Sequence, residues 1–126
     1  MITEDLKDRA LLTGVDLVSI ERIKGAAKKE RFLKRVFNEG ELRYCFGKRL
    51  PFRHLAGRFA AKEACIKALS SLGSGISFKD IEVVNGDNGR PCVKLHSRAK
   101  ELLRGRRAFL SLSYSKGLAF AFVALQ

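Results

Sequence analysis

The chain has 126 residues, which is enough for one domain and too few for two. Its hydrophobic fraction of 46% is ordinary for a globular protein, so we expect a packed core. Its polar, mixed-charge N-terminus argues against a signal peptide, and its apolar segments are far shorter than the ~20 residues needed to cross a bilayer. We therefore expect a soluble, cytoplasmic protein.

The charge balance is strongly basic. The 25 Lys and Arg residues outnumber the 13 Asp and Glu residues, which gives a formal net charge of +12. Such an excess predicts a polyanionic partner: a nucleic acid, a phosphate-rich small molecule, an acidic protein or an anionic membrane. The alternative is a solvated basic surface with no dedicated partner.

The sequence contains three cysteines, Cys45, Cys65 and Cys92, and none of them forms a CxxC pair. The two histidines, His54 and His96, are too scattered to complete a zinc site. We expect buried free thiols rather than disulfides or a metal centre.

The N-terminal part predicts one strand followed by helices. Residues 1–10 form an extension, and residues 11–20 are apolar and β-branched, which predicts a strand that leads into a helix. Residues 21–29 continue as a charged helix. Asn38 is a candidate N-cap for a further helix with two glutamates in its first turn.

A long helix is predicted over residues 52–72. Pro51 marks the start of this helix. Residues 73–75, which read Gly-Ser-Gly, terminate it. Its main apolar residues fall on one face and are Leu55, Phe59, Ile66 and Leu69.

The C-terminal third predicts antiparallel strands, with a short basic helix between two pairs of them. The last strand is apolar at nearly every position, so we expect it to be central and covered on both faces. The expected elements are strands 81–84 and 92–95, a helix through Arg104, and strands 109–114 and 118–125. Because the helices and strands are segregated along the chain, we predict a single α+β domain over residues 1–126.

Asp16 is unusual because it lies within an apolar strand. A buried carboxylate costs several kcal/mol unless it is paired or binds a cation. Gly14, two residues earlier, permits a close backbone approach or a bulge at this point. The alternative is an aspartate on an edge strand that faces water.

Glu63 and Lys67 are four residues apart and share one face of the long helix. They could form a surface ion pair of a few tenths of a kcal/mol. They could also supply a carboxylate for a metal beside a cation for phosphate, with Arg58 and Lys62 adding to the positive field. Mg²⁺ suits such a site because it binds a few carboxylates together with water and substrate phosphates.

One further segment is a candidate for phosphate binding, and another predicts only a turn. Residues 111–117 (SLSYSKG) place hydroxyls, a tyrosine and a lysine near a turn, although such residues are equally common on ordinary strands. Residues 85–91 (NGDNGRP) form a turn candidate. The chain has no GxxxxGK[ST] or GxGxxG motif.

Taken in order, these segments resemble the holo-acyl-carrier-protein synthase family of 4′-phosphopantetheinyl transferases. The resemblance covers the chain from about Leu12 onward and leaves the N-terminal extension unexplained. It rests on the segments GVDLVSIERI, FLKRVFNEGELRYC, LAGRFAAKEACIKAL, FKDIEVVNGDNGRPCVKL and FLSLSYSKGLAFAFVAL. It implies that family's fold, in which an antiparallel sheet packs against a long central helix and shorter helices.

The resemblance also implies a reaction. Coenzyme A gives its phosphopantetheine group to a serine of apo acyl carrier protein, leaving 3′,5′-ADP, in support of fatty acid biosynthesis. The implied catalytic residues are Asp16, Glu63 and Lys67, with the two carboxylates as magnesium ligands and Glu63 as the candidate that positions the general base. The residues implied to bind coenzyme A are Arg58, Lys67, Asn88, Gly89, Arg90, Ser113 and Tyr114.

Tyr114 is a departure from the family pattern, which has a histidine there in the sequence Ser-x-Ser-His. A tyrosine offers only a neutral hydrogen bond at pH 7. The family also docks acidic carrier proteins on a basic helix, which makes Arg22, Arg31 and Arg35 the docking candidates here. It forms homotrimers with active sites between subunits.

Two other functions fit parts of the sequence. A nucleic-acid-binding module would explain the charge, but the chain has no Trp, two Tyr and no binding signature, so we expect neither DNA nor RNA as a partner. A member of the same fold that binds coenzyme A without transferring anything would accommodate Tyr114.

Overall fold

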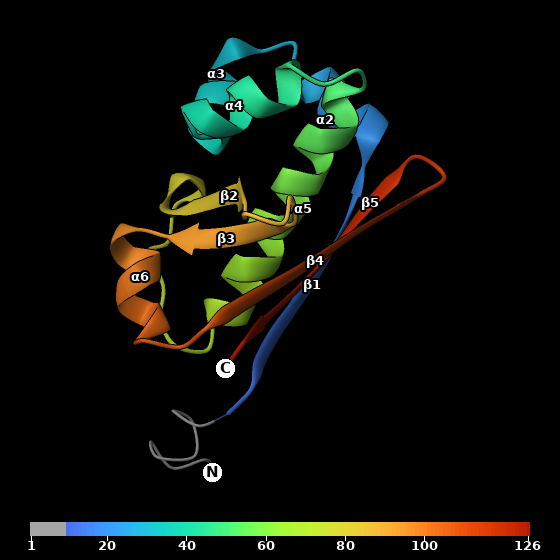
Figure 1. The fold of residues 1–126 in the computed structure, drawn as a ribbon. Coiled ribbons are helices and arrows are strands. Elements are labelled where there is room, and N and C mark those ends of the chain that lie inside the picture. The colour runs from blue at the N-terminus through green and yellow to red at the C-terminus, as the bar shows by residue number, and fades with distance from the viewer. Residues whose placement is uncertain (1–9) are drawn as a thin grey trace.

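The computed structural model describes residues 10–126, so the predicted extension lies almost entirely outside the described residues. Figure 1 shows the path of the chain. The elements are β1 (Leu12–Ser19), α2 (Ile20–Ala26), α3 (Glu30–Val36), α4 (Glu39–Phe46), α5 (Pro51–Leu69), a 3₁₀ turn η1 (Phe78–Asp80), β2 (Ile81–Asn85), β3 (Pro91–Leu95), α6 (Ser97–Leu103), β4 (Ala108–Ser115) and β5 (Leu118–Leu125).

The strands form two antiparallel sheets on either side of helix α5 (Figure 1). The larger sheet has the order β1-β5-β4, and the smaller one is the β2–β3 hairpin. The predicted α+β class and the long central helix are confirmed. The strands do not join into one hydrogen-bonded sheet, although β3 lies beside β4.

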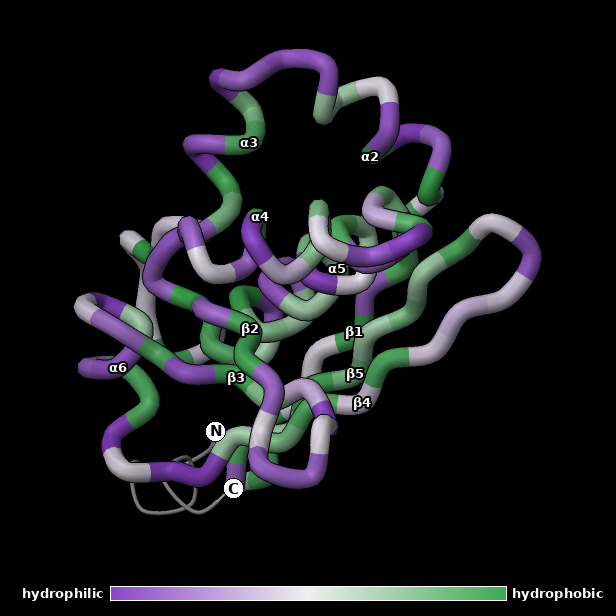
Figure 2. The backbone as a smooth tube through the Cα atoms, turned by 45° about the horizontal axis from the view of Figure 1, so that its top comes forward, coloured by the Kyte–Doolittle hydropathy of each residue, from purple (hydrophilic) through white to green (hydrophobic). Residues whose placement is uncertain are grey.

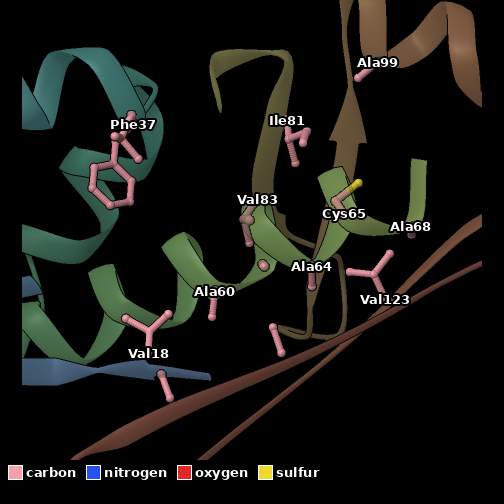
Figure 3. Close-up of a cluster of buried hydrophobic side chains, with 14 of the residues drawn as sticks. Val18, Phe37, Ala60, Ala64, Cys65, Ala68, Ile81, Val83, Ala99 and Val123 are labelled. Carbon is pink, nitrogen blue, oxygen red and sulfur yellow. The ribbon is translucent and has the colours of Figure 1, made fainter. Parts of the chain in front are cut away.

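Helix α5 packs closely on the larger sheet because small residues line their contact. Ala60, Ala64 and Ala68 of α5 are buried; Figure 3 shows Ala64 and Ala68 near Val123 of β5, and Ala60 near Val18 of β1. A Cβ atom at Gly14 would overlap the carbonyl oxygen of Ala64, so only glycine permits this spacing. Of the two alternatives for Gly14, a close backbone approach and a bulge, the structure shows the close approach.

Strand β5 is central in its sheet, but the prediction that both of its faces are covered is wrong. Alternate residues, such as Ala121 and Val123, are buried against α5. Phe120 and Phe122 point the other way and remain 37% and 45% exposed. All the helices of the described residues lie on one side of this sheet (Figure 1), so this chain leaves its outer face uncovered.

The sequence suggested that Lys62 adds to the positive electrostatic field beside Glu63 and Lys67. This prediction is wrong, because Lys62 lies fully buried in the core. Its ammonium group pairs with the Glu41 carboxylate at 2.8 Å, and neither side chain is exposed. The ammonium group also donates to the carbonyl oxygens of Phe78 and Ile81. The second Glu41 oxygen accepts from the backbone N–H of Val83 at 2.8 Å. One ion pair thus joins α4, α5, η1 and β2.

The cysteines agree with the prediction at two of three positions. Cys45 and Cys65 are buried free thiols, and burial raises their pKa to about 11 and about 12. Cys92 is exposed, so its predicted burial is wrong. It lies on a hairpin strand whose side chains alternate between the core and solvent. Within residues 10–126, no helix is both long and apolar enough to span a membrane.

The buried pair predicts a large stability effect. Replacing Lys62 by Met should lower the free energy of unfolding by about 3–5 kcal/mol, because Glu41 would keep an uncompensated buried charge. Urea denaturation followed by circular dichroism measures this difference. The double variant Lys62→Met/Glu41→Gln should recover part of the loss. A Lys62→Met protein as stable as the wild type would contradict the role assigned to this pair.

A candidate active site between strand β1 and helix α5

Asp16 faces helix α5 because the strand alternation places it on the same side as Gly14 and Val18. Its side chain is 15% exposed, and its Oδ1 accepts a hydrogen bond from Lys67 Nζ at 2.9 Å. The same ammonium group donates to the Val15 carbonyl oxygen at 3.1 Å. The predicted cost of burying Asp16 is therefore offset by an ion pair that joins β1 to α5.

Glu63 lies one helical turn before Lys67, and it shares with Asp16 the lining of a cavity of about 280 Å³. The sequence suggested a Glu63–Lys67 pair, but Lys67 binds Asp16 instead. Burial raises the pKa of Glu63, the negative charge of Asp16 raises it further, and Lys67 and Arg22 oppose the shift. The hydrogen bond to Asp16 raises the pKa of Lys67, which therefore stays charged.

The remaining walls of this cavity are mainly apolar. Ile23 of α2, Phe32 of α3 and Phe59 of α5 line it, and the two rings lie 6.1 Å apart between their centroids. Sequence reasoning assigned Phe59 to the core stripe of the helix and gave Phe32 no role. The cavity thus combines two carboxylates with an apolar wall that could receive a thin, partly apolar group.

Asp16 and Glu63 are the candidate metal ligands of this cavity. No group of three or more His, Cys, Asp or Glu side chains that could enclose a metal occurs among residues 10–126. Two carboxylates nevertheless fit Mg²⁺, which usually keeps several waters and takes its other ligands from substrate phosphates. The donor set therefore suits a magnesium ion that binds together with a phosphate-bearing molecule.

Arg58 does not line this cavity. Its guanidinium group is buried, lies 4.2 Å from the Tyr44 ring centroid and donates to Asn85 Oδ1 at 2.9 Å. Asn85 Nδ2 in turn donates to the Gly89 carbonyl oxygen at 3.0 Å. Arg58 Nε has no hydrogen-bond partner within the described residues. Arg58 thus connects α5 to the turn between β2 and β3.

That turn carries the predicted residues Asn88, Gly89 and Arg90, which are exposed. Asn88 Oδ1 accepts from the Arg90 backbone N–H at 3.0 Å, and Gly89 adopts a φ of 79° that favours glycine. None of the three lines the carboxylate cavity. Within this one chain the turn and the carboxylates form separate sites.

Ser113 and Tyr114 point to opposite faces of the sheet because they are adjacent in β4. Ser113 is exposed on the outer face, opposite Phe120, so it does not share a site with Tyr114 in this chain. The Tyr114 hydroxyl lies against Gly57 of α5, where a Cβ atom would overlap it. Burial raises the pKa of Tyr114, which therefore stays neutral at pH 7.

The structure separates the predicted docking arginines. Arg22 lines the carboxylate cavity, whereas Arg31 and Arg35 line an open concavity of about 550 Å³ on α3. Figure 2 shows that the connection from α2 to α3 is hydrophilic, in contrast to the strands of the larger sheet. A basic surface therefore adjoins the cavity without being part of it.

Comparison with known proteins agrees with this arrangement. The model of the 4′-phosphopantetheinyl transferase superfamily matches residues 13–120. A holo-(acyl-carrier-protein) synthase from Thermodesulfovibrio yellowstonii is 46% identical over 114 residues, which span 89% of this chain and 95% of that protein.

Solved structures share the fold. The ACPS–CoA complex from Chronobacterium ammoniagenes has a TM-score of 0.80 at 32% identity and covers 94% of this chain and 98% of its own. A holo-(acyl-carrier-protein) synthase from Bacillus anthracis in complex with CoA (3′,5′-ADP) has a TM-score of 0.74 at 34% identity, with coverages of 92% and 97%. From its sequence and its fold alike, this chain belongs to the 4′-phosphopantetheinyl transferase superfamily.

Proposed function

We propose that this chain transfers 4′-phosphopantetheine from coenzyme A to a serine of apo acyl carrier protein. The serine oxygen forms a bond to the β-phosphorus of coenzyme A, the bond from that phosphorus to the bridging oxygen breaks, and 3′,5′-ADP leaves. The observation that carries the proposal is the cavity that joins Asp16 and Glu63, with Lys67 beside them. The CoA complexes of its structural relatives support the choice of cosubstrate.

In this proposal Asp16 and Glu63 hold Mg²⁺. The ion, when bound, would neutralise the diphosphate charge and orient it for in-line displacement. Lys67 is a second cation at the edge of the cavity, and its exposed ammonium group can reach a phosphate oxygen. Glu63, whose pKa is raised, is the carboxylate suited to position the base that takes the serine proton.

The other candidate residues fit coenzyme A only if subunits combine. The turn with Asn88, Gly89 and Arg90 lies apart from the carboxylates in one chain, and a homotrimer with shared active sites would bring a neighbour's turn to them. The uncovered outer face of β1, β5 and β4 supports such an assembly. Its exposed apolar residues are Val15, Leu17, Phe109, Phe120 and Phe122.

The basic surface on α3 is the proposed docking site for an acidic carrier protein. Arg31 and Arg35 are exposed there, and Arg22 lines the cavity that contains the carboxylates. Charges of this kind guide association more than they add affinity. Making a holo carrier in the cytoplasm would support fatty acid biosynthesis.

The first test is direct transfer. The protein is incubated with coenzyme A, Mg²⁺ and an apo carrier, and the carrier is weighed by mass spectrometry. We expect a gain of one phosphopantetheine group, and at least a 100-fold slower gain for Asp16→Ala and Glu63→Ala, because two-carboxylate metal binding is lost. Circular dichroism controls for folding.

No gain with the wild-type protein would overturn the proposal. Binding of coenzyme A without transfer would then favour a silent member of the fold. Salt-dependent binding of DNA without coenzyme A binding would favour a nucleic-acid module.

The raised pKa of Glu63 predicts the acid limit of the reaction. A metal ligand must be deprotonated, so transfer should decline as the pH falls through a value above the usual range of a glutamate. Because Mg²⁺ and protons compete for the carboxylate, saturating Mg²⁺ should move this limit to lower pH. Transfer rates at several Mg²⁺ concentrations measure the shift. An acid limit that ignores Mg²⁺ would argue against Glu63 as a ligand.

Charge reversal on α3 tests the docking surface. Arg31→Glu combined with Arg35→Glu should raise KM for the carrier about tenfold and leave KM for coenzyme A nearly unchanged, since exposed pairs contribute about 0.2–1 kcal/mol each. Arg107→Glu, a single charge reversal just before β4, is the control for a change of surface charge away from α3. Equal effects on both substrates would refute the assignment.

A further inference from the structure

The turn between β2 and β3 is closed by hydrogen bonds within itself. The Gly86 N–H donates to the Arg90 carbonyl oxygen at 2.8 Å, and the Gly89 N–H donates to the Gly86 carbonyl oxygen at 2.8 Å. The bond from the Arg90 N–H to Asn88 Oδ1 is a third closure. The turn therefore has a defined internal shape, although residues 87–90 are exposed.

Asn85, the last residue of β2, connects this turn to helix α5. Its Oδ1 accepts from Arg58 Nη2 at 2.9 Å, and its Nδ2 donates to the Gly89 carbonyl oxygen at 3.0 Å. One side-chain amide thus uses its acceptor toward the helix and its donor toward the turn. Within residues 10–126, no other hydrogen bond joins residues 85–90 to α5.

The helix end of this connection is rigid. Arg58 is 3% exposed, and its guanidinium carbon lies 4.2 Å from the Tyr44 ring centroid. The same ring contacts Lys48 Nζ at 4.6 Å and the edge-on ring of His54, whose centroid is 5.8 Å away. A buried guanidinium that left these contacts would lack partners in the core, which is costly. Asn85 therefore ties the exposed turn to a fixed point of α5.

The orientation of the turn matters for the proposed site. Arg58 lies five residues before Glu63 on the same helix. Within one chain the turn and the carboxylate cavity are separate, so the turn can meet a ligand of that cavity only in a neighbouring subunit. A displacement of about 1 Å in a group that positions a substrate can cost about 100-fold in rate. A single amide that fixes the turn would therefore affect the neighbour's reaction.

We propose that Asn85 is a positioning residue that acts between subunits. By holding the turn on Arg58, it sets the orientation in which Asn88, Gly89 and Arg90 reach coenzyme A at the neighbour's carboxylates. Asn85 itself does not touch the cosubstrate in this scheme. The inference rests on the proposed function, because it takes coenzyme A as the cosubstrate and active sites that subunits share.

The first test separates binding from turnover. Asn85→Ala removes both amide bonds, and we expect it to raise KM for coenzyme A about tenfold, the equivalent of one lost hydrogen bond. Its kcat should stay within about twofold of the wild-type value, and KM for the carrier should not change. A purely structural defect would instead reduce the amount of active protein, which lowers kcat and leaves both KM values unchanged.

Asp87→Ala is the matched control. Asp87 lies in the same exposed turn, but its side chain has no hydrogen bond or ion pair within residues 10–126. Its replacement should not raise KM for coenzyme A. Circular dichroism checks that both variants are folded at the assay temperature.

The second test asks whether Asn85 acts on the neighbouring subunit. Chains with Asn85→Ala and chains with Asp16→Ala are given different tags, co-expressed and purified through both tags. A site that takes its carboxylates from the first chain and its turn from the second is intact. Below the KM of Asn85→Ala, mixed assemblies should therefore transfer several-fold faster per Asn85→Ala chain than Asn85→Ala alone. Partner chains that carry both substitutions should give no such gain.

Three results would overturn the inference: an unchanged KM for coenzyme A in Asn85→Ala, a loss confined to kcat, or no gain in the mixed assemblies. Transfer by the wild-type protein alongside any of these would leave the proposed function intact. A wild-type protein that transfers nothing to the carrier would overturn the proposed function and this inference together.

Discussion

The contact between Gly14 and Ala64 is the constraint on which the candidate site depends. Because glycine lets β1 approach the backbone of α5, Asp16 lies within hydrogen-bond distance of Lys67 and shares a cavity with Glu63. A larger residue in the strand would push the two elements apart and separate the carboxylates. The proposed metal site therefore depends on a steric requirement at Gly14, two residues before Asp16.

The other side of α5 adds a buried ion pair to its apolar packing. The buried pair of Lys62 and Glu41 joins α5 to α4 and to the smaller sheet, and Arg58 continues this attachment toward the turn after β2. Lys62 and Glu63 are neighbours with opposite roles, because the helix turns one side chain into the core and the other into the cavity. The helix is fixed on both sides, which keeps Glu63 oriented.

The sequence allowed the α+β class, the long helix and the pairing of a partly buried Asp16 to be predicted, because each follows from a local pattern of apolar residues and glycines. Burial of Lys62 could not be predicted, since its partner Glu41 lies 21 positions earlier and resembled an ordinary first-turn glutamate. The separation of Ser113 from Tyr114, by contrast, was predictable, because adjacent residues of a strand point to opposite faces. The motif had instead suggested a single site. Exposure of Phe120 likewise depends on what covers the sheet, which one chain's hydropathy pattern does not specify.

The fit between Tyr114 and Gly57 has a consequence for how the sequence can vary. The phenol oxygen occupies the space that a methyl group at position 57 would need, so the two positions share one volume across the contact between β4 and α5. A larger residue on the helix becomes acceptable only together with a shorter one on the strand, and the effects of such exchanges on stability should be strongly non-additive. Glycine at position 57 is therefore required for as long as tyrosine occupies position 114.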